Sequence, residues 1–129
     1  MTAAKAPNYV LIDSSGWLEY LTDGSKADDF APFFEESLPI LVPTLVLFEV
    51  RKQLLRGFGK AHAEKFLSQA LRQTVVPLDE QVALATAEAT LAHDLAMTDA
   101  VIYTTARLHN AELVTADPAF KGLPDVTLL

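Results

Sequence analysis

The sequence predicts an α/β protein in which a central parallel sheet of four to five short strands is covered by helices on both faces. Apolar segments of about four to six residues alternate along the chain with longer segments whose apolar residues recur at helical spacing. Strands that are apolar at almost every position are typical of parallel sheets buried on both faces. At 129 residues the chain has the length of one domain, and we assign residues 1–129 to a single domain.

The first strand and helix are expected at the start of the chain. Residues 8–13 (NYVLID) form a nearly continuous apolar run, which favours a buried strand. Residues 14–21 (SSGWLEYL) then place Trp17, Leu18 and Leu21 on one face of a short helix.

A second helix and strand follow. Residues 27–37 (ADDFAPFFEES) have a helical pattern around Pro32, with Asp28 and Asp29 in the first turn, where the helix dipole favours acids. Residues 39–43 (PILVP) are a second short strand bounded by prolines.

The middle of the chain predicts a pair of helices and the third strand. The helical pattern runs from residue 44 to 56, and Gly57 and Gly59 stop it before a second helix over 60–73. Residues 74–78 (TVVPL) are the third strand.

The last part of the chain predicts two more helices and two strands. Asp79 can cap a long helix through residues 82–95, and either Thr98 or Asp99 can cap another that runs to about His109. The remaining strands are 111–116 (AELVTA) and, at the edge of the sheet, 125–129 (DVTLL).

Composition limits the classes of function. No apolar run approaches the roughly 20 residues that span a bilayer, and the N-terminal MTAAKAP lacks the apolar core of a signal peptide, so we expect a cytoplasmic protein that is not in a membrane. Because the chain has no cysteine, it has neither disulfides nor thiolate metal sites.

The charge balance is acidic, but the basic residues are clustered. The net charge of −7 argues by itself against a polyanionic partner. Six of the ten Lys and Arg residues nevertheless lie between residues 51 and 72, with Glu64 as the one acid among them. Either this segment is a solvated helical face or it contacts nucleic acid. The candidate RNA-binding residues are Arg51, Lys52, Arg56 and Lys60.

Isolated acids lie where apolar segments end or break. These acids are Asp13 after YVLI, Glu49 within LVLFEV, Asp99 within AMTDAVIY and Asp117 after LVTA. Burying an unpaired charge costs about 3 kcal/mol or more, so acids placed in this way need a compensating partner. A shared divalent cation is the simplest such partner. Since ligands collect beyond the carboxyl ends of parallel strands, these acids would share one edge of the sheet.

Structural roles are an alternative for three of the four acids. Asp13 and Asp117 have the pattern of helix N-caps, and Asp99 that of a helix-start acid. A cap cannot explain Glu49, which lies within a helix among apolar neighbours.

These motifs together resemble the PIN-domain ribonucleases, specifically the VapC-type toxins of prokaryotic toxin–antitoxin pairs. The resemblance rests on LIDSS, a mid-helix Glu in TLVLFEVRKQL, TDAVIYTTA and LVTAD, in that order, and it covers Tyr9 to about Leu128. It implies a three-layer α/β/α fold, RNA cleavage that depends on Mg²⁺ or Mn²⁺, a homodimer, and inhibition by a small cognate antitoxin.

The resemblance also implies roles for individual residues. Asp13, Glu49, Asp99 and Asp117 match the family's acidic quartet, which makes them the candidate catalytic residues and metal ligands. Thr115 matches the usual hydroxyl position, and Ser14 is a second supporting hydroxyl that could instead cap a helix.

Two rival classes remain open. One is a catalytically silent PIN-like protein that binds RNA or serves as a scaffold. The other is a receiver-like phosphoacceptor domain, although this class normally has two adjacent acids after the first strand, where this chain has Asp13 and Ser14. A site built from the three scattered histidines, His62, His93 and His109, is disfavoured by their spacing.

Overall fold

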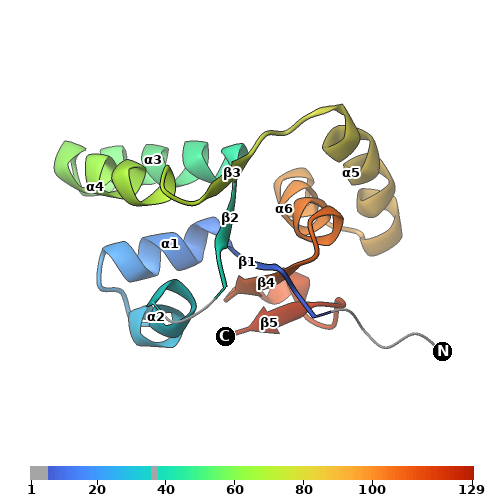
Figure 1. The fold of residues 1–129 in the computed structure, drawn as a ribbon, viewed down its shortest axis with the longest axis horizontal. Coiled ribbons are helices and arrows are strands. Elements are labelled where there is room, and N and C mark those ends of the chain that lie inside the picture. The colour runs from blue at the N-terminus through green and yellow to red at the C-terminus, as the bar shows by residue number, and fades with distance from the viewer. Residues whose placement is uncertain (1–5, 36–37) are drawn as a thin grey trace.

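A five-stranded parallel sheet lies at the centre of the computed structural model, which describes residues 6–35 and 38–129. The strands follow the order β3-β2-β1-β4-β5, with every neighbouring pair parallel (Figure 1). Their bounds are β1 Tyr9–Ile12, β2 Ile40–Pro43, β3 Thr74–Val76, β4 Ala111–Thr115 and β5 Val126–Leu128. The predicted parallel α/β sheet is confirmed, with the fifth strand at its edge.

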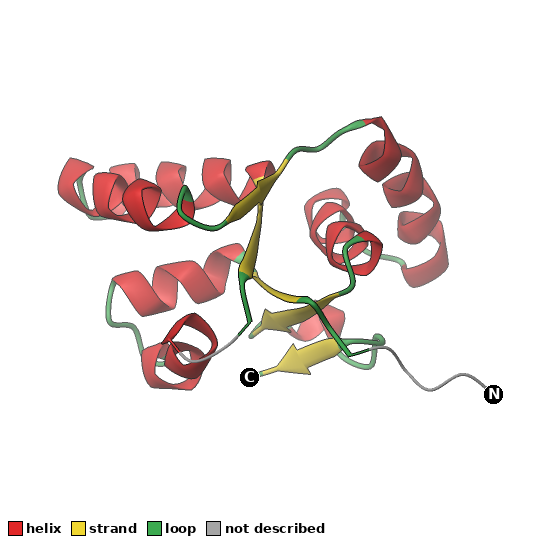
Figure 2. Cartoon of the chain, viewed as in Figure 1, coloured by secondary structure: helices red, strands yellow, loops and turns green. Residues whose placement is uncertain are grey.

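Helices cover both faces of the sheet and produce three layers (Figures 1 and 2). Helices α1 to α4 lie on one side, and α5 and α6 on the other. Their bounds are α1 Ser14–Leu21, α2 Ala27–Glu35, α3 Thr44–Gly57, α4 Lys60–Ala70, α5 Glu80–His93 and α6 Met97–Leu108, with a short 3₁₀ helix at Pro118–Phe120. The described part of the chain contains no helix that is both long and apolar enough to cross a membrane.

Several helix ends differ from the sequence prediction. The last two residues predicted for the second helix, 36–37, lie outside the described residues. Asp79 caps α5 as predicted, its side chain accepting a hydrogen bond from the Val82 amide at 2.9 Å. Helix α5 ends at His93 because Asp94 adopts a left-handed conformation, with φ of 52°.

The predicted cap of the next helix is wrong. Helix α6 begins at Met97, and Ala96 is its N-cap residue without a side-chain hydrogen bond. Neither Thr98 nor Asp99 caps the helix, because both already lie in its first turn.

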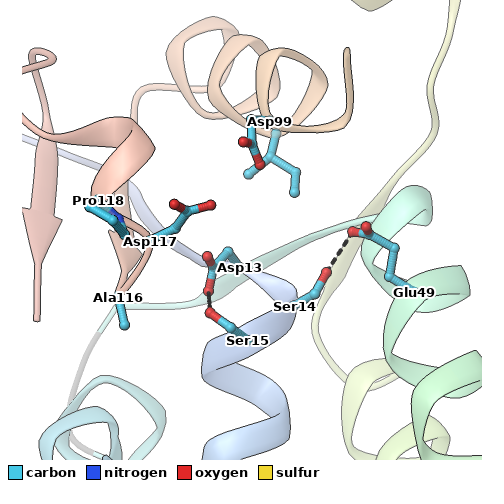
Figure 3. Close-up of a pocket in the computed structure, with 9 residues that line it drawn as sticks. Asp13, Ser14, Ser15, Glu49, Asp99, Ala116, Asp117 and Pro118 are labelled. Carbon is cyan, nitrogen blue, oxygen red and sulfur yellow. Dashed lines mark hydrogen bonds between the residues drawn. The ribbon is translucent and has the colours of Figure 1, made fainter. Parts of the chain in front are cut away.

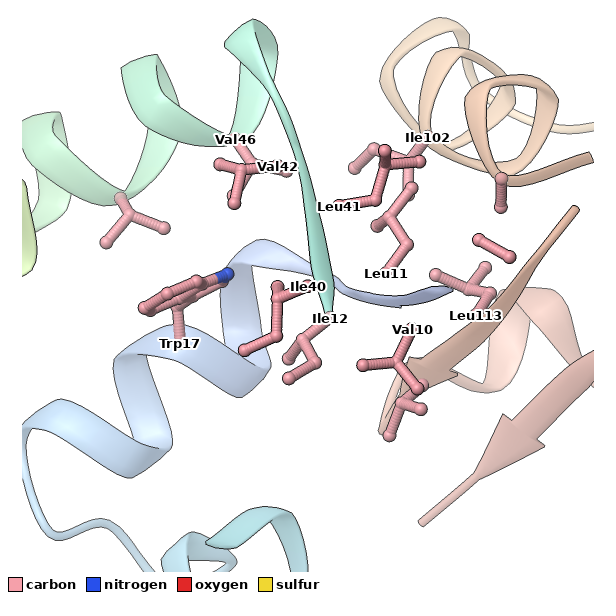
Figure 4. Close-up of a cluster of buried hydrophobic side chains, with 14 of the residues drawn as sticks. Val10, Leu11, Ile12, Trp17, Ile40, Leu41, Val42, Val46, Ile102 and Leu113 are labelled. Atoms are coloured by element: carbon pink, nitrogen blue, oxygen red, sulfur yellow. The ribbon is translucent and has the colours of Figure 1, made fainter. Parts of the chain in front are cut away.

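The hydrophobic core is formed by the sheet and by the inner faces of the helices (Figure 4). Each of the three inner strands contributes consecutive buried residues, since both faces of the sheet are covered. The fully buried side chains include Leu11, Ile12, Trp17, Leu41, Val42, Val46, Leu54, Phe66 and Leu113.

The sheet order places the ends of β1 and β4 next to each other. The two strands pair in parallel, with Ile12 opposite Val114. Asp13, which follows β1, and the segment from Thr115, the last residue of β4, to Asp117 therefore reach the same edge.

Candidate functional site

A pocket of about 410 Å³ lies at the carboxyl end of the sheet. Its lining comes from the β1–α1 junction, α3, α6 and the segment after β4 (Figure 3). The lining residues are Asp13, Ser14, Ser15, Glu49, Asp99, Ile102, Ala116, Asp117 and Pro118. The structure thus brings all four candidate acids into one pocket, whose lining includes neither lysine nor arginine.

Asp13 is the most buried of these acids, with 6% of its surface exposed. Its Oδ1 accepts hydrogen bonds from the Gly16 amide at 3.0 Å and the Ser15 hydroxyl at 2.8 Å, so the carboxylate also caps α1 as predicted. Its Oδ2 accepts from the Thr115 hydroxyl at 2.5 Å. Burial raises the pKa of Asp13 despite the lowering effect of these hydrogen bonds, and Asp117 raises it further.

Thr115 links the two acids at the end of the sheet. Its buried hydroxyl donates to Asp13 and accepts from the Asp117 amide at 3.0 Å. The Asp117 side chain in turn accepts from the Ala119 amide at 2.9 Å and caps the 3₁₀ helix, with Pro118 in its first turn. The predicted capping pattern at Asp117 is confirmed, and the capping residue still lines the pocket.

Glu49 reaches the pocket from α3, whose buried stripe includes Val46 and Val50. The Ser14 hydroxyl donates to Glu49 Oε1 at 2.6 Å (Figure 3). The alternative role of Ser14 as a helix cap is filled by Asp13, and the hydroxyl that contacts Asp13 is that of Ser15. Sequence reasoning missed Ser15; the available signal was its position two residues after a helix-capping aspartate.

Asp99 lies in the first turn of α6 and points into the same opening (Figure 3). Burial raises the pKa of Asp99, and the charges of Asp117, Asp13 and Glu49 raise it further. The mutual repulsion of these carboxylates is the electrostatic condition that a bound cation relieves.

The donor set fits a hydrated Mg²⁺ or Mn²⁺ ion. Carboxylates and hydroxyls are the hard oxygen ligands that such ions prefer. Within residues 6–35 and 38–129, no three carboxylate or imidazole side chains are arranged to hold one ion by themselves. This arrangement is compatible with Mg²⁺, which usually keeps several waters and takes only one or two protein carboxylates.

The predicted RNA-binding residues lie outside the pocket. Arg51 forms a salt bridge with Glu64 at 2.9 Å, which ties α3 to α4. The Lys52 ammonium lies 5.3 Å from the centre of the Phe48 ring. Arg56 and Lys60 are exposed on the same pair of helices.

The histidines do not form a site within the described residues. His62 packs near Phe58, and His93 packs against Tyr103. His109 contacts the Thr105 carbonyl through Nδ1 at 2.9 Å.

Solved structures of similar fold include three toxin–antitoxin proteins. A toxin–antitoxin complex from Klebsiella pneumoniae contains a chain 24% identical to this one, with a TM-score of 0.75 over 92% of this chain and 95% of that chain. VapC20 of Mycobacterium tuberculosis, described as a sarcin–ricin loop cleaving toxin, is 17% identical, with a TM-score of 0.76 over 91% and 96% of the two chains. VapBC2 of Rickettsia felis, solved with a promoter DNA fragment, is 16% identical, with a TM-score of 0.71 over 94% and 97%. These likenesses concern the fold.

The sequence itself identifies the family. No curated protein matches it. The PIN domain family model, however, matches residues 10–126, a range that contains all four pocket acids. This match leaves the receiver-like alternative without support. The chain belongs to the PIN domain family.

Proposed function

We propose that the protein is an endoribonuclease dependent on Mg²⁺ or Mn²⁺, and that it acts as the toxin of a type II toxin–antitoxin pair. The observation that carries this proposal is the pocket in which four acids from distant parts of the chain meet without a lysine or arginine in the lining. Family membership and the toxin–antitoxin neighbours support it.

In this proposal the four acids hold and orient the reacting groups. Asp13, Asp99 and Asp117 are the candidate direct metal ligands, with one or two of them on any one hydrated ion, and Glu49 would be either a further ligand or an outer base. A bound divalent ion would supply an activated water and would neutralise charge on the scissile phosphate. Thr115 holds the Asp13 carboxylate in one orientation through its 2.5 Å hydrogen bond, and Ser15 supports the other oxygen.

The expected products follow from hydrolysis by water. Attack by water on the phosphorus, with departure of the 3′ oxygen, leaves a 5′-phosphate and a 3′-hydroxyl on the fragments. A 2′,3′-cyclic phosphate would contradict the mechanism, because that product requires attack by the RNA's own 2′-hydroxyl.

The decisive experiment is cleavage of a small-RNA pool, including tRNA, and of ribosomal RNA. The purified protein is tested with Mg²⁺, with Mn²⁺ and with EDTA, beside the Asp13→Asn variant. Asparagine is also a good N-cap, so this variant removes the charge while it preserves the start of α1. We expect discrete, metal-dependent cuts that fall at least about 100-fold in the variant. Absence of cutting by metal-loaded protein freed of antitoxin would favour the alternative of a silent RNA-binding or scaffold protein.

The proposed partners are an RNA substrate, a cognate antitoxin and a second copy of the chain, all met in the cytoplasm. Exposed apolar residues on α3 and at the C-terminal ends of α3 and α4 support a protein partner, namely Phe48, Leu55, Phe58 and Leu71. Leu54 and Phe66 of the same helices are 0% exposed and belong to the core, so they are not available to a partner. Light scattering of the protein alone, and with the product of the neighbouring short reading frame, tests both associations.

A further inference from the structure

We propose that Ser14 is a positioning residue that holds the Glu49 carboxylate at the pocket and thereby sets the affinity of the site for a divalent ion. The inference rests on the proposed function, because it assumes that the pocket binds such an ion. It assigns Ser14 a role different from capping or from contact with Asp13.

The contact joins two elements far apart in the sequence. Ser14 is the first residue of α1, and Glu49 lies within α3, 35 residues later. The 2.6 Å separation of Ser14 Oγ and Glu49 Oε1 is typical of a hydroxyl that donates to an ionised carboxylate. Both residues line the acid pocket.

The capping role that a serine at this position would otherwise have is already filled. The side chain of Asp13 caps α1 by accepting from the Gly16 amide. The contact between Asp13 and a neighbouring hydroxyl is likewise made by Ser15. The Ser14 hydroxyl is left with a tertiary partner, and that partner is Glu49.

Glu49 needs such a partner more than Asp13 and Asp117 do. Its side chain has one more rotatable bond than aspartate, and immobilising it costs conformational entropy. Asp13 accepts three hydrogen bonds and Asp117 caps a turn, so each of these two side chains is already held by hydrogen bonds of its own. The negative charges of the other pocket acids also repel the Glu49 carboxylate. The same repulsion is seen at Asp99, whose pKa the charge of Glu49 helps to raise. With Oε1 held by Ser14, Oε2 remains available to a metal ion or to its bound water.

The test measures Mn²⁺ affinity by titration calorimetry on RNA-free protein. Ser14→Ala is expected to weaken binding roughly 10-fold, the lower end of the loss that follows removal of a side chain orienting a metal ligand. Ser14→Thr, which keeps the hydroxyl, is expected to restore most of the affinity. Ser68→Ala, on the exposed face of α4, is the matched control and should leave affinity unchanged.

A double-mutant cycle separates positioning from a general structural effect. In the Glu49→Gln background, Ser14→Ala should cause less than a twofold further change, because the carboxylate that Ser14 positions is gone. Ser14→Cys, close in size but a weak donor, provides the same comparison if the alanine variant does not fold. Circular dichroism in EDTA verifies the fold of each variant.

The outcomes distinguish a failure of the role of Ser14 from a failure of the proposed function. Affinity of Ser14→Ala within twofold of the parent protein, or an equal loss in the Glu49→Gln background, overturns the role of Ser14 and leaves the proposed function standing. Failure of the parent protein to bind Mn²⁺ at millimolar concentration overturns both.

Discussion

Two carboxylates in this protein each cap a helix and also line the acid pocket. Asp13 caps α1 and Asp117 caps the 3₁₀ helix, yet both line the acid pocket. The capping and functional interpretations of these residues, which compete at the level of sequence, are therefore compatible in three dimensions. Asp99 and Glu49 differ, since neither caps a helix in the structure.

Asp99 should destabilise the metal-free fold at neutral pH. Its pKa is raised in the folded state, so the folded chain binds more protons than the unfolded chain between the two pKa values, and stability falls as pH rises through that interval. We expect Asp99→Asn to raise the Tm in EDTA by a few degrees at pH 7 while it abolishes cleavage. The gain should shrink as pH is lowered toward 4, because the parent carboxyl then becomes protonated. Thermal unfolding followed by circular dichroism measures both quantities.

Asp29→Asn is the control for the helix-dipole effect. Asp29 is an exposed acid in the first turn of α2, where a negative charge is favourable. Its replacement should lower the Tm slightly or leave it unchanged. A lower Tm for Asp99→Asn at pH 7 would contradict the prediction that burial of the Asp99 charge and its repulsion by the other pocket acids destabilise the fold.

The residues of the pocket were more predictable than their contacts. Charges that interrupt apolar segments stand out in the sequence because burial makes them costly, and this signal selects all four pocket acids, Asp13, Glu49, Asp99 and Asp117. The pairing of Ser14 with Glu49, and of Ser15 with Asp13, depends on how α1 packs beside α3, which the local sequence does not encode. The catalytic roles of the four pocket acids stay predictions.

At the scale of elements, the seating of α1 depends on Gly16. A Cβ built at this position would lie 2.5 Å from Ile12 Cγ2 and 2.7 Å from Phe30 Cε1, so α1 can approach β1 and α2 only without that atom. The Gly16 amide also donates to Asp13. The close packing of α1 thus determines where one pocket carboxylate is held.

Gly16→Ala is therefore expected to destabilise the protein by about 1–3 kcal/mol, the usual cost of overpacking. The clash outweighs the gain of about 1 kcal/mol from the better helix propensity of alanine. Urea unfolding measures the change. Gly57→Ala is the matched control, because a Cβ there meets nothing within 4 Å; equal effects at both positions would refute the packing argument.

The type and order of the elements followed from the sequence, whereas some of their ends did not. Five short apolar segments became strands because both faces of the sheet are covered. The start of α6 was misplaced because no side chain caps it, so the pattern on which the prediction relied is absent there. The early end of α5 depends on the left-handed Asp94, a conformation that aspartate adopts only in some contexts.

At the scale of the whole molecule, charge is distributed unevenly. The net charge is −7, the pocket is lined by acids, and half of the ten Lys and Arg residues lie on α3 and α4. Arg51 is partly neutralised by Glu64, whereas Lys52 and Arg56 have no ion-pair partner among the described residues. An RNA that reaches the pocket across α3 would meet these two side chains.

The double variant Lys52→Ala/Arg56→Ala should weaken RNA binding uniformly across sequences. In the Asp13→Asn background, we expect the slope of log K against log salt to become smaller by about 1.4, because two phosphate contacts to a single strand are lost. Fluorescence anisotropy at several salt concentrations measures it. The Lys26→Ala/Arg107→Ala pair removes the same charge from elsewhere, and an equal effect there would indicate a response to net charge alone.

The sheet order also determines when the pocket can exist. Strand β1 lies at the centre, and its neighbour β4 is supplied about a hundred residues later in the chain, as the Thr115–Asp13 hydrogen bond shows with its separation of 102 residues. Asp99 and Asp117 are likewise contributed by the last third of the chain. During translation, the complete acid pocket can therefore assemble only after residue 117 has left the ribosome, and every shorter nascent chain lacks it.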